Sequence, residues 1–425
     1  GLKHISKDKQ ELASDLGLTL DYDFNGEAYQ TVSGQNSNNS VRLSNDFMRA
    51  ARDGADWDLI NRTDGKVARS IQADGLWSQI CRAAWESADP GLQFDTTINE
   101  WHTCPVDGRI NASNPCSEYM FLDDTACNLA SINLLKFWNA PKQTFDINGF
   151  EHAIDIWTIV LEISVLMAAF PSRSIAERSW RYRTLGLGYA NLGALLMQSG
   201  IPYDSEEGRC VAGILTASLT GRSYAMSARM AKEHGAFAGF DDNRDKMLRV
   251  IRNHRLAAMG TDRDSKDWEN IEIRPVPIDH DTARSGNINI ANSGELLDHA
   301  IDAWDRALAD GSSHGFRNAQ VTVIAPTGTI GLLMDCDTTG VEPDFALTKF
   351  KKLAGGGYFK IANQSLRPSL LGLGYAEDEA NEILRWVMGT LDLDVPMPGD
   401  DGEESRDGRT FRDYLIEQGY TTADI

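Results

Sequence analysis

Hydrophobic and polar residues alternate along one short stretch of the chain and recur at helical spacing along several longer ones. In LASINLL, residues 129–135, alanine, isoleucine and leucine alternate with serine and asparagine. This alternation predicts a strand with one buried face. The β-branched run QVTVI, residues 320–324, predicts a second strand that leads into a turn rich in proline, glycine and threonine. Strands are therefore predicted in the first third and in the last third of the chain.

Apolar residues at helical spacing predict helices over residues 43–52, 75–90, 150–170, 205–235 and 292–310. The longest apolar stretch, IDIWTIVLEISVLMAAF, contains Asp155, Thr158 and Glu162 at helical spacing and ends before Pro171. Because it is slightly short for a membrane span and carries two acidic residues, we interpret it as a buried helix of a soluble protein. Strands mixed with long helices predict an α/β fold.

Charge and cysteine content narrow the class of protein. The 425 residues carry a formal net charge of −21, which argues against a protein that binds nucleic acid or membrane surfaces. Six cysteines without a CxxC pair indicate neither a disulfide framework nor a zinc site, and we expect no metal bound by the chain's own residues. The polar opening GLKHISKDKQELASDLG lacks the apolar core of a signal peptide. We therefore expect a cytoplasmic protein with reduced thiols.

One cysteine stands out for its neighbours, in the segment NPCSE at residues 114–118. Proline pushes the preceding residue into extended geometry, and alternate side chains of an extended segment share one face. On this reasoning Asn114, Cys116 and Glu118 point the same way and Ser117 points the other way. The segment would then present an amide, a thiol and a carboxylate to one substrate.

Other interpretations of this cysteine stay open on the residues alone. Most free cysteines are small buried hydrophobic residues. A cysteine nucleophile would need a histidine base, and the nearest histidine, His102, is not indicated by any spacing.

A second candidate site is APTGTIG, residues 325–331, directly after the predicted strand at 320–324. Backbone N–H groups, threonine hydroxyls and a helix N-terminus would form a phosphate cradle there. The segment is not a Walker loop, because the chain contains no GxxxxGK[ST]. An ordinary strand-to-helix turn explains it equally well. We interpret the glycines of GLGY, residues 186–189, as allowing tight turns and close helix–strand packing.

NPCSEYMFLDDTACNLASINLLKF, residues 114–137, resembles the finger loop and following strand of ribonucleotide reductase large subunits, above all the adenosylcobalamin-dependent class II enzymes. Residues 34–50, 182–205, 235–255 and 315–360 resemble the same family, so the similarity covers nearly the whole chain. Class I large subunits, which receive their radical from a partner protein, share much of this scaffold and remain an alternative. A non-catalytic nucleotide-binding paralogue is a second alternative.

The resemblance implies a role for each residue of the cysteine segment. Cys116 would become a thiyl radical that removes the ribose 3′ hydrogen, and Glu118 would take the proton of the 3′-hydroxyl. Asn114 would hydrogen-bond the sugar hydroxyls. Cys127 would belong to a redox pair that supplies the reducing equivalents. The substrate would be bound by Ser117 and by the turn residues Pro326, Thr327, Gly328, Thr329 and Ile330.

The resemblance also implies the fold, the reaction and the partners. We expect residues 1–425 to form one catalytic region, a ten-stranded α/β barrel of the ribonucleotide reductase and glycyl-radical enzyme type that is incomplete at both ends. The reaction would be reduction of ribonucleoside di- or triphosphates to 2′-deoxyribonucleotides with adenosylcobalamin, a cobalt cofactor. The implied partners are dNTP or ATP effectors, a thioredoxin-like reductant and a second copy of the chain.

Two regions of the family are expected to lie outside this sequence. They are the N-terminal region that reads the effectors, which also carries the partner of Cys127, and a C-terminal tail with a cysteine pair. We therefore expect that the 425 residues do not sustain turnover alone.

Overall fold

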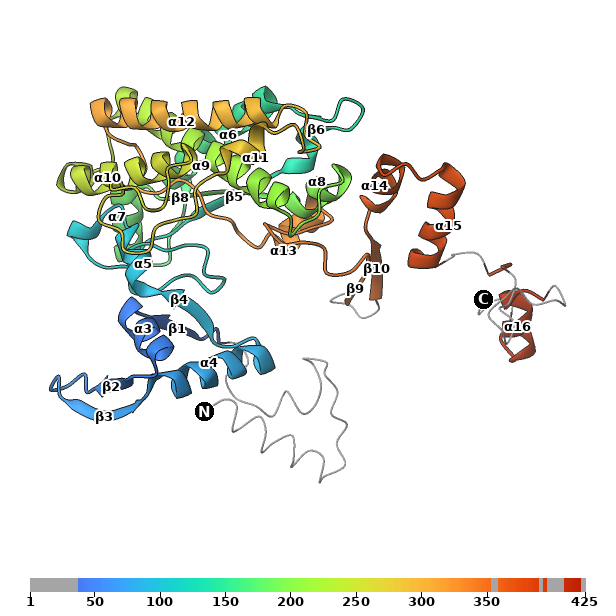
Figure 1. The fold of residues 1–425 in the computed structure, drawn as a ribbon, viewed down its shortest axis with the longest axis horizontal. Coiled ribbons are helices and arrows are strands. Elements are labelled where there is room, and N and C mark those ends of the chain that lie inside the picture. The colour runs from blue at the N-terminus through green and yellow to red at the C-terminus, as the bar shows by residue number, and fades with distance from the viewer. Residues whose placement is uncertain (1–36, 353–357, 390–392, 396–408, 422–425) are drawn as a thin grey trace.

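The computed structural model of the chain describes residues 37–352, 358–389, 393–395 and 409–421 (Figure 1). The polar opening stretch, on which part of the localisation argument rests, lies outside these residues. The strands are β1 (Ser40–Leu43), β2 (Asp56–Ile60), β3 (Val67–Gln72), β4 (Gly91–Phe94), β5 (Asn128–Asn133), β6 (Trp138–Asn139), β7 (Thr144–Phe145), β8 (Leu185–Ala190), β9 (Thr348–Lys352) and β10 (Tyr358–Ala362).

The helices include all five that the periodicity predicted, with ends that differ by a few residues. The α-helices are α3 (Asn45–Asp53), α4 (Ala73–Ser87), α5 (Asp95–Glu100), α6 (Ile147–Met167), α7 (Arg173–Tyr182), α8 (Leu192–Gln198), α9 (Glu206–His234), α10 (Phe240–Ala258), α11 (His280–Arg284), α12 (Ser293–His314), α13 (Gly328–Leu333), α14 (Leu366–Gly372), α15 (Glu377–Met388) and α16 (Phe411–Glu417). Two 3₁₀ helices, η1 (Pro105–Asp107) and η2 (Leu134–Phe137), are also present. The α/β class is confirmed.

Three parallel chain segments form the centre of the molecule. β5 pairs with β8 in parallel, and β8 is flanked on its other side by residues 320–323. The backbone N–H of Leu185 donates to Gln320 O at 2.8 Å, and that of Val323 donates to Leu187 O at 3.1 Å. The strand predicted at 129–135 is confirmed as β5. The strand predicted at 320–324 forms only an isolated bridge beside β8.

Long helices cover these central segments (Figure 1). α9 and α12 pack against each other, and α6 packs against α9 and against β5 and β8. One hydrophobic cluster joins the strands to the helices and includes the buried Ile132 of β5, Leu187 of β8, Leu161 of α6 and Leu215 of α9. The parallel segments are thereby held in a fixed register, which determines where the loops at their ends begin.

The prediction of a buried helix at 150–170 is wrong for one face of α6. Ile154, Leu161 and Val165 are buried, but a stripe of apolar side chains on the opposite side is exposed, comprising Ile156, Trp157, Val160, Ile163, Leu166 and Met167. An apolar stretch that is hydrophobic all round leaves part of its surface uncovered when only one side faces the core. None of the described helices is long and apolar enough to cross a membrane.

A small layer built from β1 to β4 with α3 and α4 lies beside the central segments (Figure 1). β1 and β4 are parallel partners, and Arg42 stands opposite Gln93 in their register. The helix α3 begins at Ser44, whose hydroxyl accepts a hydrogen bond from Phe47 N at 3.2 Å. This layer has its own hydrophobic cluster, which includes the buried Leu43 and Phe47.

The described strands do not form the closed ten-stranded barrel that the resemblance implies. They pair two by two: β1 with β4, β2 with β3, β5 with β8, β6 with β7, and β9 with β10. Within the described part of the chain, the parallel set around β8 is the portion that such a barrel would contain. The strand count of the barrel therefore stays a prediction.

Candidate active site

The extended geometry predicted for NPCSE is wrong, because the chain folds back at this point. The backbone N–H of Ser117 donates to Asn114 O at 3.0 Å and closes a β-turn. Pro115 occupies the second position of this turn, where its fixed φ is favoured. Cys116 is the third residue, and its side chain is exposed. Alternation therefore does not place the three candidate side chains on one face.

The side-chain amide of Asn114 bonds to the backbone just after the turn. Its Oδ1 accepts a hydrogen bond from the backbone N–H of Tyr119 at 2.9 Å. Ser117, between them, has φ of +65°, in the left-handed region that an L residue adopts at a cost. The Oδ1 atom of Asn114 therefore helps to shape the turn.

The structure brings Glu118 and Cys127 into the same electrostatic environment. Burial, with the negative charge of Glu118 as the second cause, raises the pKa of the Cys127 thiol to about 12. Glu118 Oε2 is buried and, within the described part of the chain, has no hydrogen-bond partner. A buried carboxylate oxygen without a donor is costly to maintain. Such an atom is typical of a site that awaits a proton or a hydroxyl group.

The raised pKa of Cys127 also limits the chemistry available there. At neutral pH the side chain is a thiol, whereas nucleophilic cysteines react as thiolates. Cys127 is therefore unsuited to nucleophilic attack at neutral pH.

A glycine on β8 makes room for the Cys127 side chain. A Cβ atom at Gly186 would lie 2.3 Å from Cys127 Sγ and 3.0 Å from Val323 Cγ2. Gly188, two residues on, approaches the backbone of the 320–323 segment equally closely. The glycines of GLGY therefore serve close packing, as expected, but they lie within a buried strand and not in a turn. Sequence reasoning did not connect Gly186 with the site.

Hydrogen bonds fix the chain between the cysteine turn and β5. The hydroxyl of Tyr119 lies 2.9 Å from both Thr125 Oγ1 and Thr184 Oγ1. Thr184 also donates to Ala126 O at 2.7 Å, and Ala126 N donates to Ser179 Oγ at 3.1 Å. Burial is the main cause that raises the pKa of Tyr119, so this hydroxyl stays protonated. The segment that carries Glu118 and Cys127 is thus tied to the end of α7 and the start of β8.

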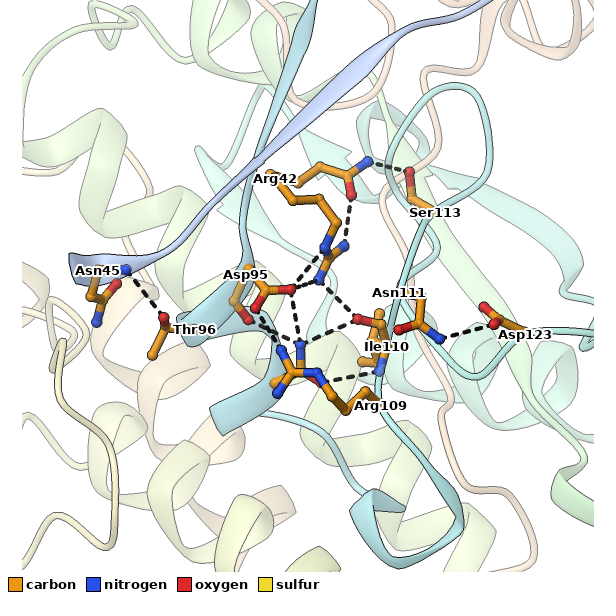
Figure 2. A network of polar contacts seen from close by, with 11 residues as sticks. Arg42, Asn45, Asp95, Thr96, Arg109, Ile110, Asn111, Ser113 and Asp123 are labelled. Atoms are coloured by element: carbon orange, nitrogen blue, oxygen red, sulfur yellow. Dashed lines mark hydrogen bonds and ion pairs between the residues drawn. The ribbon is translucent and has the colours of Figure 1, made fainter. Parts of the chain in front are cut away.

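A network from the β1–β4 layer holds the chain that enters the turn (Figure 2). Arg42 binds Asp95 Oδ1 through Nε at 2.8 Å and through Nη2 at 2.6 Å, and Nη2 also donates to Ile110 O at 2.9 Å. Gln93 Nε2 donates to Ser113 Oγ at 2.7 Å. Neither Arg42 nor Gln93 was predicted as a site residue. Their only sequence signal is their place in short strands far from the cysteine motif.

The second predicted set, Pro326 to Ile330, forms the turn from the 320–323 segment into α13. Thr327 has φ of +52° and is buried, and its Oγ1 accepts a hydrogen bond from Gly340 N at 2.7 Å. Pro326, Gly328, Thr329 and Ile330 are exposed. A Cβ atom at Gly328 would meet nothing within 4 Å. The turn therefore has a buried anchor and an open outer surface.

The two predicted sets lie toward opposite ends of the central parallel segments. Cys127 immediately precedes β5, whereas Pro326 to Ile330 follow the end of the neighbouring 320–323 segment. No hydrogen bond among the described residues joins one set to the other. A ligand that contacts both sets would have to span the length of β8.

Comparison with known proteins gives one family. The model of the ribonucleotide reductase barrel domain matches residues 14–392 of the chain. A protein of Agrobacterium fabrum named vitamin B12-dependent ribonucleotide reductase is 60% identical over 371 residues, which cover 87% of this chain and 28% of that protein. A protein of Bradyrhizobium diazoefficiens with the same name is 58% identical over 369 residues, with the same two shares.

A more distant relative carries a more specific name. The vitamin B12-dependent ribonucleoside-diphosphate reductase of Mycobacterium tuberculosis is 30% identical over 318 residues, which cover 75% of this chain and 36% of that protein. The chain thus spans little more than a quarter of the length of the two more similar relatives.

Proposed function

The chain belongs to the ribonucleotide reductase barrel family, and from this premise we propose that it forms the catalytic region of an enzyme that reduces ribonucleotides to 2′-deoxyribonucleotides. The observation that carries the proposal is the arrangement around the cysteine turn. Cys116 is exposed, the Glu118 carboxylate two residues later has a buried oxygen without a partner, and Cys127 nearby stays a protonated thiol.

Each residue then has a task on the ribose. Cys116, as a thiyl radical, removes the 3′ hydrogen atom, and its exposure on the turn supports this role. Glu118 accepts the proton of the 3′-hydroxyl through its unpartnered oxygen. The remaining NH₂ group of Asn114 hydrogen-bonds the sugar hydroxyls. Ser117 belongs to the same turn and contacts the substrate.

Reduction at C2′ needs two electrons and two protons, which two thiols supply as they form a disulfide. The 2′-hydroxyl leaves as water, and a hydrogen takes its place. Cys127 is one of these thiols, and its S–H form at neutral pH supports the role. The second thiol comes from the family's upstream redox partner. A thioredoxin-like dithiol then reduces the disulfide.

The phosphates of the substrate bind at the turn Pro326 to Ile330. Support comes from the exposed outer surface of this turn above the buried Thr327 anchor. Because the chain carries a net charge of −21, local N–H groups and hydroxyls must hold the anionic phosphates there.

Adenosylcobalamin is the proposed cofactor, because the relatives are named vitamin B12-dependent. Cys116 is the residue that fits this group, since its side chain is open to a molecule outside the fold. When bound, the cofactor supplies the radical chemistry that takes a hydrogen atom from a thiol. A class I large subunit, which would depend on a partner protein instead, is the alternative that the names of the relatives disfavour.

The complete fold we propose is the ten-stranded α/β barrel of this family, with residues 1–425 forming part of one catalytic region. The parallel packing of β5, β8 and residues 320–323 supports it. Ribonucleoside di- or triphosphates as substrates, dNTP or ATP effectors, a homodimer and a cytoplasmic location complete the proposal.

The test is deoxynucleotide formation by the complete enzyme with each ribonucleotide, a dithiol reductant and adenosylcobalamin. We expect product only when adenosylcobalamin is present. Product that requires an added radical-bearing protein would assign the chain to class I. Nucleotide binding without product under either condition would favour a non-catalytic paralogue.

A further inference from the structure

Gln93, on β4, is a buried amide that is bonded at both ends. Gln93 is only 3% exposed, whereas the other residues of β4 are half-buried or exposed. Oε1 accepts a hydrogen bond from Arg42 Nη1 at 2.8 Å. Nε2 donates to Ser113 Oγ at 2.7 Å and lies 3.5 Å from Ser117 Oγ. Gln93 therefore connects the β1–β4 layer to the cysteine turn.

The direction of the Gln93 amide is determined by its partner on β1. A guanidinium group has only donors, so Gln93 must present its oxygen to Arg42 and its NH₂ group to the serines. Arg42 is itself immobilised, because it stands opposite Gln93 in the strand register and is ion-paired with Asp95 at 2.6 Å. The position of the NH₂ group is therefore set by the packing of two strands and not by the turn.

The two serines lie on either side of Cys116. Ser113 comes three residues before it and Ser117 one residue after it, and their hydroxyl oxygens are 3.3 Å apart. Ser113 Oγ also donates to Asn114 O at 2.7 Å, the carbonyl that closes the turn. Ser117 is the residue with left-handed backbone. A donor that reaches both hydroxyls can therefore hold the two arms of the turn together.

We propose that Gln93 is a positioning residue that holds the Cys116 turn through Ser113 and Ser117 and so orients the thiol. The turn's conformation follows from the geometry alone, whereas its consequence for ribonucleotide reduction rests on the proposed function. The two parts are therefore tested separately.

The conformational part is tested by hydrogen–deuterium exchange on the complete enzyme with Gln93→Met. Methionine keeps the length of the side chain but forms neither hydrogen bond. We expect exchange in a peptide covering residues 115–119 to rise by about two- to tenfold, the factor for one lost hydrogen bond. Peptides from α9 should keep their rates. Asn111→Ala is the matched control, because Asn111 lies in the same loop but its side chain donates to Asp123 Oδ2 at 2.9 Å.

A mutant cycle distinguishes action through the serines from a general loss of packing. If Gln93 acts through their hydroxyls, adding Gln93→Met to the Ser113→Ala, Ser117→Ala double variant should change exchange at 115–119 little further. Additive increases, or faster exchange spread over the β1–β4 layer, would show that Gln93 is only a packing residue and would overturn the proposal.

The functional part is measured in the complete enzyme. Gln93→Met should lower kcat about ten- to a hundredfold with KM within about twofold, because a misplaced thiol slows chemistry more than it weakens substrate binding. Unchanged kcat with faster exchange at the turn would overturn the positioning role. If the parent enzyme forms no deoxynucleotide, the proposed function fails, while the exchange measurement still decides whether Gln93 holds the turn.

Discussion

The cysteine turn (residues 114–117) and the threonine turn (residues 326–330) share a backbone feature but differ in which side chains they expose. Each contains one non-glycine residue with positive φ, Ser117 at +65° and Thr327 at +52°. Ser117 is bonded through its backbone to Asn114 O, its hydroxyl lies near Ser113 Oγ and Gln93 Nε2, and the residue next to it, Cys116, is exposed. Thr327 instead is buried and bonded to the backbone of Gly340, and the residues after it are exposed as the start of a short helix.

The difference shows what each turn offers a ligand. The first presents an exposed thiol and, one residue past the turn, a carboxylate with an unpartnered oxygen, which are the side chains proposed to react. The second buries its one large polar side chain and leaves small residues and backbone outside. Chemistry is thus expected to fail when side chains of the first turn change, and binding is expected to fail when the outer surface of the second turn is filled.

Cys116→Ser, in the cysteine turn, should have the largest effect on activity. Serine keeps the size of the side chain but lacks the easily abstracted S–H, so deoxynucleotide formation by the complete enzyme should fall below detection while nucleotide binding persists. Product formation and equilibrium binding are the measurements. Cys81→Ser is the control, because Cys81 is also exposed but lies on α4. Measurable turnover by Cys116→Ser would remove the thiyl assignment.

Glu118→Gln should lower kcat by about 10²–10⁴-fold, the usual contribution of a general base. The amide cannot accept the 3′-hydroxyl proton, although its size is preserved. Steady-state rates under saturating substrate test this. Glu177→Gln, which changes an exposed carboxylate paired with Arg173, should leave kcat unchanged. A Glu118 variant within a factor of two of the parent would exclude this carboxylate from the mechanism.

Gly328→Val should raise the substrate KM by roughly tenfold, which corresponds to about 1.4 kcal/mol of lost binding. The new side chain would enter open space on the outer surface of the turn, so thermal stability should change little. Gly188→Ala should instead lower the melting temperature, because the new Cβ would lie 2.3 Å from Val323 O inside the fold. KM and melting temperature together test the pair. An unchanged KM for Gly328→Val would argue against phosphate binding at this turn.

The smallest expected effect concerns the thiol of Cys127. Burial and the charge of Glu118 raise its pKa to about 12, so alkylation through the thiolate should be slow at pH 8 and should accelerate as pH rises toward that value. Glu118→Gln removes the smaller of the two causes and lowers this pKa, so alkylation at pH 8 should become faster, by a few-fold. Site-resolved mass spectrometry follows the reaction. A slower reaction in the variant would show that the carboxylate does not act on this thiol.

The sequence named candidate residues that lie within one segment. The motif NPCSE named Asn114, Cys116 and Glu118, but alternation suggested an extended segment. The observed turn is closed by the bond from Ser117 N to Asn114 O, and Gln93 contacts it from outside through Ser113. A proline signals both extended backbone before it and a turn around it, so local rules alone did not decide between them. Likewise, the periodicity of α6 predicted the helix, whereas the exposure of Trp157 depended on which neighbours cover it.

By itself the sequence determined the elements whose cause is local: the alternation of β5, the helical spacing of α6 and α9, and the family to which the cysteine motif points. Only the tertiary structure decided that Glu118 lies close enough to Cys127 to raise its pKa, and that Gly186 makes room for that thiol. It alone placed Gln93 against the serines beside Cys116. The physical reason is the distance along the chain over which each interaction acts. Periodicity and turn preferences act over a few residues, but contacts between distant segments exist only after the strands have paired and the helices have packed around them.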